Sequence, residues 1–220
     1  QSTLVKKVGI QSDDAAKLVE LGRINGLTQN EVLSSITSQT NALFEQEAIQ
    51  LDNRDILSEV AQINGQLAAN YANNPKAIAK AVVATRRLGL SLSAAKDATE
   101  GLLDFEESIT SEVQAELLLG RELNLDRARG LALQGKSAEA AEELAKNFGT
   151  LKDFQSLNVL QQNALAKSMG MTSDELANVL LQQENLNKLS DGTKKRIQDR
   201  AKELRAEGKV AEANALLSRS

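Results

Sequence analysis

Apolar residues recur along the chain at steps of three and four positions, which is the spacing of one face of an α-helix. The clearest case is residues 93–119, for which the pattern predicts one long helix. Its apolar stripe consists of Ala94, Ala95, Ala98, Leu102, Phe105, Ile109, Val113 and Leu117. No sustained stretch alternates between apolar and polar residues as a half-buried strand does. The pattern therefore predicts an all-α protein of multiple short amphipathic helices in a compact or beaded bundle.

The same junction of a glycine, an apolar residue and a Ser or Thr separates several of these helices. It occurs at Gly26-Leu27-Thr28, Gly89-Leu90-Ser91 and Gly170-Met171-Thr172. Glycine closes a helix in the left-handed conformation, and the hydroxyl side chain caps the next helix. Glu31 and Glu175 follow the two threonines at the spacing of a capping box. These glycine corners predict that the chain folds back on itself.

The corners and the periodicity together predict the positions of the helices. Asn74 before Pro75 predicts a helix start, because proline is favoured at the first helical position. We expect helices at residues 12–25, 28–50, 53–64, 75–88, 93–119, 125–134, 137–147, 151–169, 173–189, 193–207 and 209–218. The breaks near 64–74 and 188–192 predict three segments. These are an N-terminal helical segment (1–74), a central helical segment (75–189) and a basic C-terminal helical tail (190–220).

The composition excludes several classes of site. The 220 residues include no Cys, no His and no Trp, so the usual ligands of zinc, haem and iron–sulfur clusters are missing. Catalysis by a Cys nucleophile or a Ser-His-Asp triad is impossible within this chain. No stretch approaches the roughly 18 apolar residues of a membrane span. We expect no catalytic residue, cofactor or metal ion, and no stable membrane span in this segment.

The charge is unevenly distributed. Residues 101–187 carry 7 basic and 14 acidic side chains, a net charge of −7, whereas residues 188–220 carry 9 and 5, a net charge of +4. The basic tail is formed by Lys194, Lys195, Arg196, Arg200, Lys202 and Arg205. These side chains could contact phosphates. The interpretation that the sequence favours is a solvated helix face, because Glu203 and Glu207 are interleaved with them.

Three carboxylates lie close together at Asp104, Glu106 and Glu107. A glycosidase needs a pair of acids on opposite sides of a sugar ring, but these residues are too close in sequence to flank one. With Glu100, Asp104 and Glu107 could also approach a Ca²⁺ ion, although the spacing of a calcium loop is missing. The favoured interpretation is a solvated or salt-bridged helix face. The charged segment 121–129 likewise predicts structural or interface ion pairs.

Several blocks between residues 76 and 180 are informative through their order and spacing. The blocks are AVVATRRLGLS at 81–91, LLDFEESI at 102–109, LLGRELNLDRAR at 118–129, LNVLQQNALA at 157–166 and MGMT at 169–172, before DEL at 174–176. Through these blocks, residues 76–180 resemble the tail tape measure proteins of long-tailed bacteriophages, and residues 1–75 and 190–220 match more loosely.

The resemblance implies a structural and not an enzymatic role. Tape measure proteins occupy the lumen of the tail tube, set its length during assembly in the host cytoplasm, and leave ahead of the DNA. They form a small symmetric set of copies, bound near the tip by baseplate or hub proteins. On this view the chain is a fragment of a virion protein, which agrees with a start at Gln1 without an initiator Met; a processed end is the alternative. The glycine corners favour an end domain over the measuring rod.

The contact surface expected from this role is the apolar stripe of the predicted 93–119 helix. Its candidate helix–helix contacts are Leu102, Phe105, Ile109, Val113 and Leu117, although for any one of these residues the sequence favours a place in the core of the chain itself.

Two other functions stay open at this point. The first is a helical regulatory module that binds a partner protein or nucleic acid, because the glycine corner is superficially similar to a helix-turn-helix. The acidity of residues 101–187 argues against DNA, and only the basic tail argues for it. The second is cleavage of peptidoglycan by Glu106 or Glu107, which ranks last.

Overall fold

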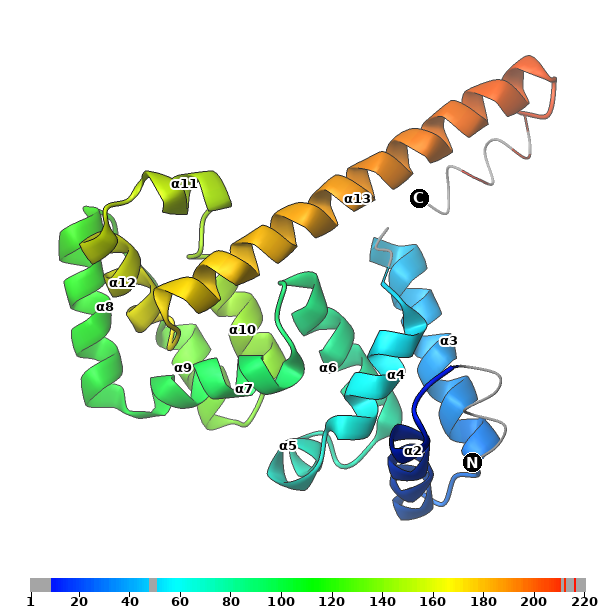
Figure 1. Ribbon diagram of the computed structural model, residues 1–220, viewed down its shortest axis with the longest axis horizontal. Coiled ribbons are helices and arrows are strands. Elements are labelled where there is room, and N and C mark those ends of the chain that lie inside the picture. The colour runs from blue at the N-terminus through cyan, green and yellow to red at the C-terminus, as the bar shows by residue number, and fades with distance from the viewer. Residues whose placement is uncertain (1–8, 48–50, 211, 213–215, 217–220) are drawn as a thin grey trace.

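The computed structural model describes residues 9–47, 51–210, 212 and 216, and every regular element in this part of the chain is helical (Figure 1). The predicted all-α class is therefore confirmed. The elements are α2 (Ser12–Ile24), α3 (Gln29–Glu47), α4 (Asn53–Gln62), α5 (Gly65–Asn70), α6 (Pro75–Arg87), α7 (Leu92–Glu100), the short 3₁₀ helix η1 (Gly101–Leu103), α8 (Phe105–Leu119), α9 (Asp126–Leu133), α10 (Ser137–Ala145), α11 (Leu151–Ser156), α12 (Val159–Ser168) and α13 (Ser173–Ala206).

The helices enclose two clusters of buried apolar side chains. The first core cluster lies between α2, α3, α4, α5 and α6, and the second lies among α7 to α12 and the start of α13. Leu92 of α7 and Ala138 of α10 pack in the first cluster, so the two clusters meet along α6, α7 and α10. Leu, Ile, Val and Ala fill most of this interior, as the low aromatic content predicts.

Polar caps start several helices at the predicted residues. Asn74 accepts a hydrogen bond from the Lys76 N–H at 2.9 Å, with Pro75 in the first turn of α6. Thr172 caps α13 through a complete capping box with Glu175. Hydrogen bonds from the backbone N–H and the hydroxyl of Thr172 hold the pKa of Glu175 below its ordinary value. Such caps satisfy backbone N–H groups that have no partner within the helix.

Glycines with positive φ close the helices that precede the corners, and Gly170 has a φ of +70° between α12 and α13. Met171 N–H donates back to the Ala166 carbonyl at 3.0 Å, which is the hydrogen bond of a Schellman closure. The backbone of Gly170 also lies against α7. A Cβ atom at this position would lie 2.2 Å from the Ala98 carbonyl oxygen, so only glycine fits here.

The prediction of one helix over residues 93–119 is wrong. The chain leaves the α conformation at η1, and Asp104 begins a new helix by accepting a hydrogen bond from the Glu107 N–H at 3.1 Å. The apolar spacing continues across this break, because Leu102 and Phe105 fit a helical period by chance. A polar cap therefore begins a new helix inside a continuous apolar pattern, and the apolar periodicity alone does not reveal the break between the two helices.

Further differences from the predictions are α5, which lies within the expected break near 64–74, and two helix boundaries. Residues 151–169 divide into α11 and α12, because Asn158 is extended and forms a capping box with Gln161. The expected break at 188–192 is absent, and α13 continues through Gly192 to Ala206. A single glycine weakens a helix by only about 1 kcal/mol relative to alanine, which 34 helical residues tolerate. Parts of the helices predicted at 28–50 and 209–218 lie outside the described residues.

A buried carboxylate, that of Glu59, links α4 to α6 and α7. Glu59 of α4 pairs with Arg86 of α6 and accepts a hydrogen bond from the Leu92 N–H at 2.6 Å at the start of α7. A buried carboxylate needs such partners, since desolvating an unpaired charge is unfavourable. One side chain thereby fixes the positions of three helices.

The helix α13 is long, and its distal half projects away from the two cores (Figure 1). Its first turns contribute Leu176, Val179 and Leu180 to the second core cluster. Near its far end Ala201 and Leu204 are buried against Leu216. The predicted segment boundaries at 74 and 189 stay predictions.

Candidate interaction surface

The structure divides the predicted apolar stripe between the interior and the surface. Leu102 lies in η1 and is only 1% exposed in the second core cluster. The other four candidates lie on α8, where Phe105, Ile109, Val113 and Leu117 are 44%, 49%, 48% and 78% exposed. Their spacing of four residues places them along one side of the helix. We call these four residues the α8 face.

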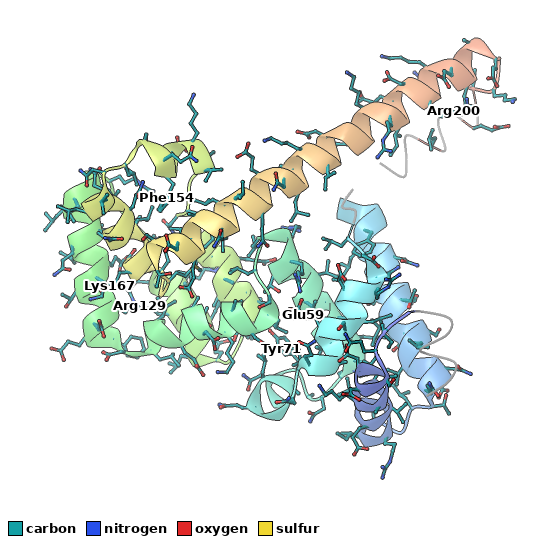
Figure 2. All side chains as sticks on the ribbon, viewed as in Figure 1. Glu59, Tyr71, Arg129, Phe154, Lys167 and Arg200 are labelled. Atoms are coloured by element: carbon teal, nitrogen blue, oxygen red, sulfur yellow. The ribbon has the colours of Figure 1, made fainter. Side chains whose placement is uncertain are left out.

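The helix α12 packs antiparallel to α8 and holds it in place. Lys167 near the end of α12 pairs with Glu107 at the start of α8 at 3.1 Å. At the other end, Gln161 donates a hydrogen bond to the Leu118 carbonyl at 2.8 Å. The position of Lys167 between the two helices is visible in Figure 2. These two contacts fix the direction and register of the pair.

The first turn of α12 carries further exposed apolar side chains near the end of α8. Val159 and Leu160 are each 70% exposed, and they begin the helix whose Gln161 reaches Leu118. Leu118 is itself exposed beside Leu117. Large exposed side chains that gather at one end of a helix pair are typical of an interaction site. Apolar periodicity did not identify these residues as exposed, although the consecutive Val159 and Leu160 were a signal in the sequence.

The three carboxylates considered for a Ca²⁺ ion have different structural partners. Asp104 caps α8, Glu107 pairs with Lys167, and Glu100 pairs with Lys96 at 2.5 Å. Asp104, Glu106, Glu107 and Lys167 border a shallow hollow of about 350 Å³ on the α8 surface. Among the described residues, no group of three or more Asp and Glu side chains is placed to hold a metal ion.

A second hollow of about 360 Å³ lies where the corner between α6 and α7 meets α13. Its polar lining includes Arg86, Ser91 and Glu175. Arg86 pairs with Glu59, Ser91 caps α7 by accepting from the Ala94 N–H, and Glu175 completes the capping box of α13. These polar side chains therefore already serve the fold.

The charged segment 121–129 forms ion pairs that fix α9 on α8. Arg129 is buried, pairs with Glu112, and donates to Ser108 Oγ at 3.0 Å and to Asp126 at 2.8 Å (Figure 2). Arg127 pairs with Glu143 at 3.2 Å, a partner that lies in α10. Asp126 is a partner within the same segment, as the sequence predicts, but Glu112 and Glu143 could not be identified from local spacing.

The six basic residues of the tail all lie on the distal half of α13 and are exposed, and Arg200 marks this part of the helix in Figure 2. Arg200 pairs with Glu203 at 2.8 Å, and Lys202 lies 3.6 Å from Asp199. Pairs three residues apart are those expected of a solvated helix face.

In the part of the chain that is described, no helix is long and apolar enough to cross a membrane.

Comparison with known proteins gives no relative for this chain: no protein-family model, curated protein or solved structure matches it.

Proposed function

We propose that the chain is a segment of a phage tail tape measure protein. In this role it helps to set tail length, sits in the tail tube lumen or at the tip, and leaves with the DNA at ejection. It acts through helix–helix contacts with other copies of itself and with tip, baseplate hub and tube proteins, and it is a structural protein without enzymatic activity.

The observation that carries this proposal is the α8 face. Of its four exposed apolar side chains, Phe105 and Ile109 lie within the block at 102–109 that resembles tape measure proteins, and Val113 and Leu117 lie between this block and the one at 118–129. Fully burying one such side chain stabilises an interface by roughly 1.5–3 kcal/mol. Leu118, Val159 and Leu160 are also exposed and add apolar surface at this end of the α8–α12 pair.

The lengths of the helices favour an end domain over the measuring rod. An extended ruler of continuous helix advances about 1.5 Å per residue. From α2 to α12 the helices contain between 6 and 19 residues, and the chain turns back between them. A folded-back unit is suited to anchoring at a tip or initiator complex, whereas α13, with 34 residues, is suited to leading away from it.

Mass spectrometry of purified phage particles tests this role directly, by counting the chain relative to a tube subunit. We expect a few copies per tail, found only in the tail fraction. In-frame deletion of the segment from the parent gene should shorten tails or block their initiation. Absence of the chain from the particle, or normal tails of unchanged length after the deletion, would contradict the proposal.

Variants of the α8 face test the surface itself. Ile109→Glu with Leu117→Glu places two charges on the face, and we expect tail assembly to fail while the helical circular dichroism spectrum is unchanged. Ile24→Glu is the matched control, because Ile24 is 61% exposed and lies on α2, a helix that packs on the first core cluster. Normal assembly of the double variant would exclude the α8 face as the contact surface.

A second candidate function is a helical regulatory module that binds a partner protein or nucleic acid. It is favoured by one observation, the six exposed basic residues on the distal half of α13. Phosphate contacts weaken steeply with salt, so a gel shift over a salt series distinguishes this function. Retarded nucleic acid whose binding falls with salt would support it, and no shift at low salt would exclude its nucleic-acid form.

A further inference from the structure

The tripeptide Ile-Asn-Gly occurs twice in the chain, at residues 24–26 and 63–65. An asparagine before glycine is prone to deamidation, because no side chain on glycine hinders the approach of its backbone nitrogen. The two asparagines have the same immediate neighbours, so any difference in their reactivity comes from the fold.

We propose that Asn64 is a site of spontaneous deamidation and that Asn25 is protected from it. In this reaction the backbone nitrogen of Gly65 loses its proton and attacks Cγ of Asn64. A C–N bond forms, the side-chain nitrogen leaves as ammonia, and a five-membered succinimide remains. Water then adds to one of the two ring carbonyls and opens the ring, which gives either aspartate or isoaspartate. Water is the only co-reactant, and no oxidation or reduction takes place.

The surroundings of Asn64 leave this reaction open. The side chain is exposed, makes no capping hydrogen bond, and donates only a long one from Nδ2 to the Gln62 carbonyl at 3.2 Å. Gly65 is the first residue of α5, where a backbone N–H has no partner inside the helix. A Cβ atom built on Gly65 meets nothing within 4 Å, so there is room beside the attacking nitrogen.

Asn25 is held in a different way. Its Nδ2 donates to the Leu21 carbonyl at 2.9 Å and to the Asn73 carbonyl at 2.6 Å. The Gly26 N–H, which would have to attack, donates to the Arg23 carbonyl at 3.1 Å. All three hydrogen bonds must break before the ring can close at this position.

The backbone conformations point in the same direction. The succinimide ring requires the glycine nitrogen to lie nearly eclipsed with Cβ about the Cα–C bond. The ψ of −178° at Asn64 is closer to that arrangement than the ψ of 6° at Asn25. Asn64 reaches it by a smaller rotation in an exposed turn, whereas Asn25 must leave the closure of α2.

Deamidation at Asn64 changes the turn between α4 and α5. Both products add a negative charge, and isoaspartate also inserts a methylene group into the backbone. The neighbours Ile63 and Leu67 are buried in the first core cluster, so the longer backbone displaces packed side chains there. Deamidation at this turn therefore accumulates slowly as the protein molecule ages.

The test is to incubate the purified full chain at mildly alkaline pH, digest it with trypsin and follow both sites by mass spectrometry. Cleavage after Arg54 and Lys76 places Asn64 in the peptide 55–76, and cleavage after Arg23 and Arg54 places Asn25 in the peptide 24–54. We expect Asn64 to react at least about tenfold faster than Asn25 in the folded protein, since each hydrogen bond that must open reduces the reactive population several-fold.

Two controls make the result decisive. In concentrated denaturant the two rates should become similar, because the local sequences match. The variant Asn64→Gln should lose the modified peptide 55–76 and its labelling by an isoaspartyl methyltransferase. Equal rates at the two sites in the folded chain, or faster reaction at Asn25, would overturn the proposal. A rate ratio that persists unchanged in denaturant would overturn it as well, since the fold would not be its cause.

Discussion

The backbone of Gly170 lies against that of Ala98, so that a Cβ atom on residue 170 would be 2.2 Å from the Ala98 carbonyl oxygen. Ala98 belongs to α7, and Gly170 forms the corner between α12 and α13. The contact therefore seats the base of the projecting helix α13 on the second core cluster. Two requirements meet at this glycine: a positive φ and the absence of a side chain.

Substituting Gly170→Ala should destabilise the fold more than the same change at Gly120. Gly120 has a φ of +65° but no atom within 4 Å of a built Cβ, so Gly120→Ala isolates the effect of conformation. We expect about 1–2 kcal/mol for the left-handed conformation alone. Displacing the packed backbone of Ala98 should add about 1–3 kcal/mol at Gly170. Urea unfolding measures both, and equal losses would show that the close contact is absent.

The buried ion pair of Arg129 predicts a large effect of one substitution. Arg129→Met leaves Glu112 without its cationic partner, and breaking a buried pair in this way costs about 3–5 kcal/mol. Arg23→Met is the control, because its pair with Glu20 is exposed and exposed pairs contribute about 0–1 kcal/mol. Thermal unfolding compares the two. Adding Glu112→Gln to Arg129→Met should recover part of the loss, and no recovery would contradict the assignment of the pair.

The division of the apolar stripe into a buried part and an exposed part can be tested by truncating one residue of each part. Leu102→Ala opens a cavity in the second core and should destabilise the chain by about 2–5 kcal/mol. Leu117→Ala removes an exposed side chain and should change the stability of the isolated chain by less than about 0.5 kcal/mol. Denaturant midpoints at equal m-values report both changes. A large loss from Leu117→Ala would mean that the α8 face is already covered in the free protein.

Tyr71 should titrate at an unusually high pH. Burial raises the pKa of its phenol to about 12, an effect that the hydrogen bond from the Ala138 N–H partly offsets. Tyr71 is the single tyrosine and the chain has no tryptophan, so near-ultraviolet absorbance follows this group alone. The unfolded chain in guanidinium should titrate near the ordinary pKa of 10.0. A folded-state value at 10 would show that the ring is not buried against α10.

The same shift links Tyr71 to stability in a defined direction. The folded pKa lies above the unfolded one, so the contribution of Tyr71 is fully present below pH 10 and is lost as the pH rises toward about 12. Tyr71→Phe removes the ionisable group and should flatten this part of the stability profile relative to the parent chain. Parallel profiles for the two proteins would contradict the linkage.

The all-α class and most helix starts could be predicted from the sequence because they depend on local interactions. Asn74 with Pro75, and Thr172 with Glu175, act within a few residues of one another, so their spacing is informative before the chain folds. The same locality explains the errors. Asp104 could begin a new helix inside an apolar pattern, and Gly192 could remain within one, without any change in the hydrophobic period.

The candidate surface shows what the sequence alone does not predict, namely which apolar residues are buried and which are exposed. The spacing of Leu102, Phe105 and Leu117 made them equivalent members of one stripe, since periodicity identifies a face without showing what covers it. Only the tertiary structure buried Leu102 and left Leu117 exposed, because η1 packs against α7 and α9, whereas α12 covers a different side of α8 from the one that carries Leu117. Local interactions therefore determined the helices and their caps, whereas contacts between residues distant in sequence decided which apolar side chains form the core and which remain for a partner.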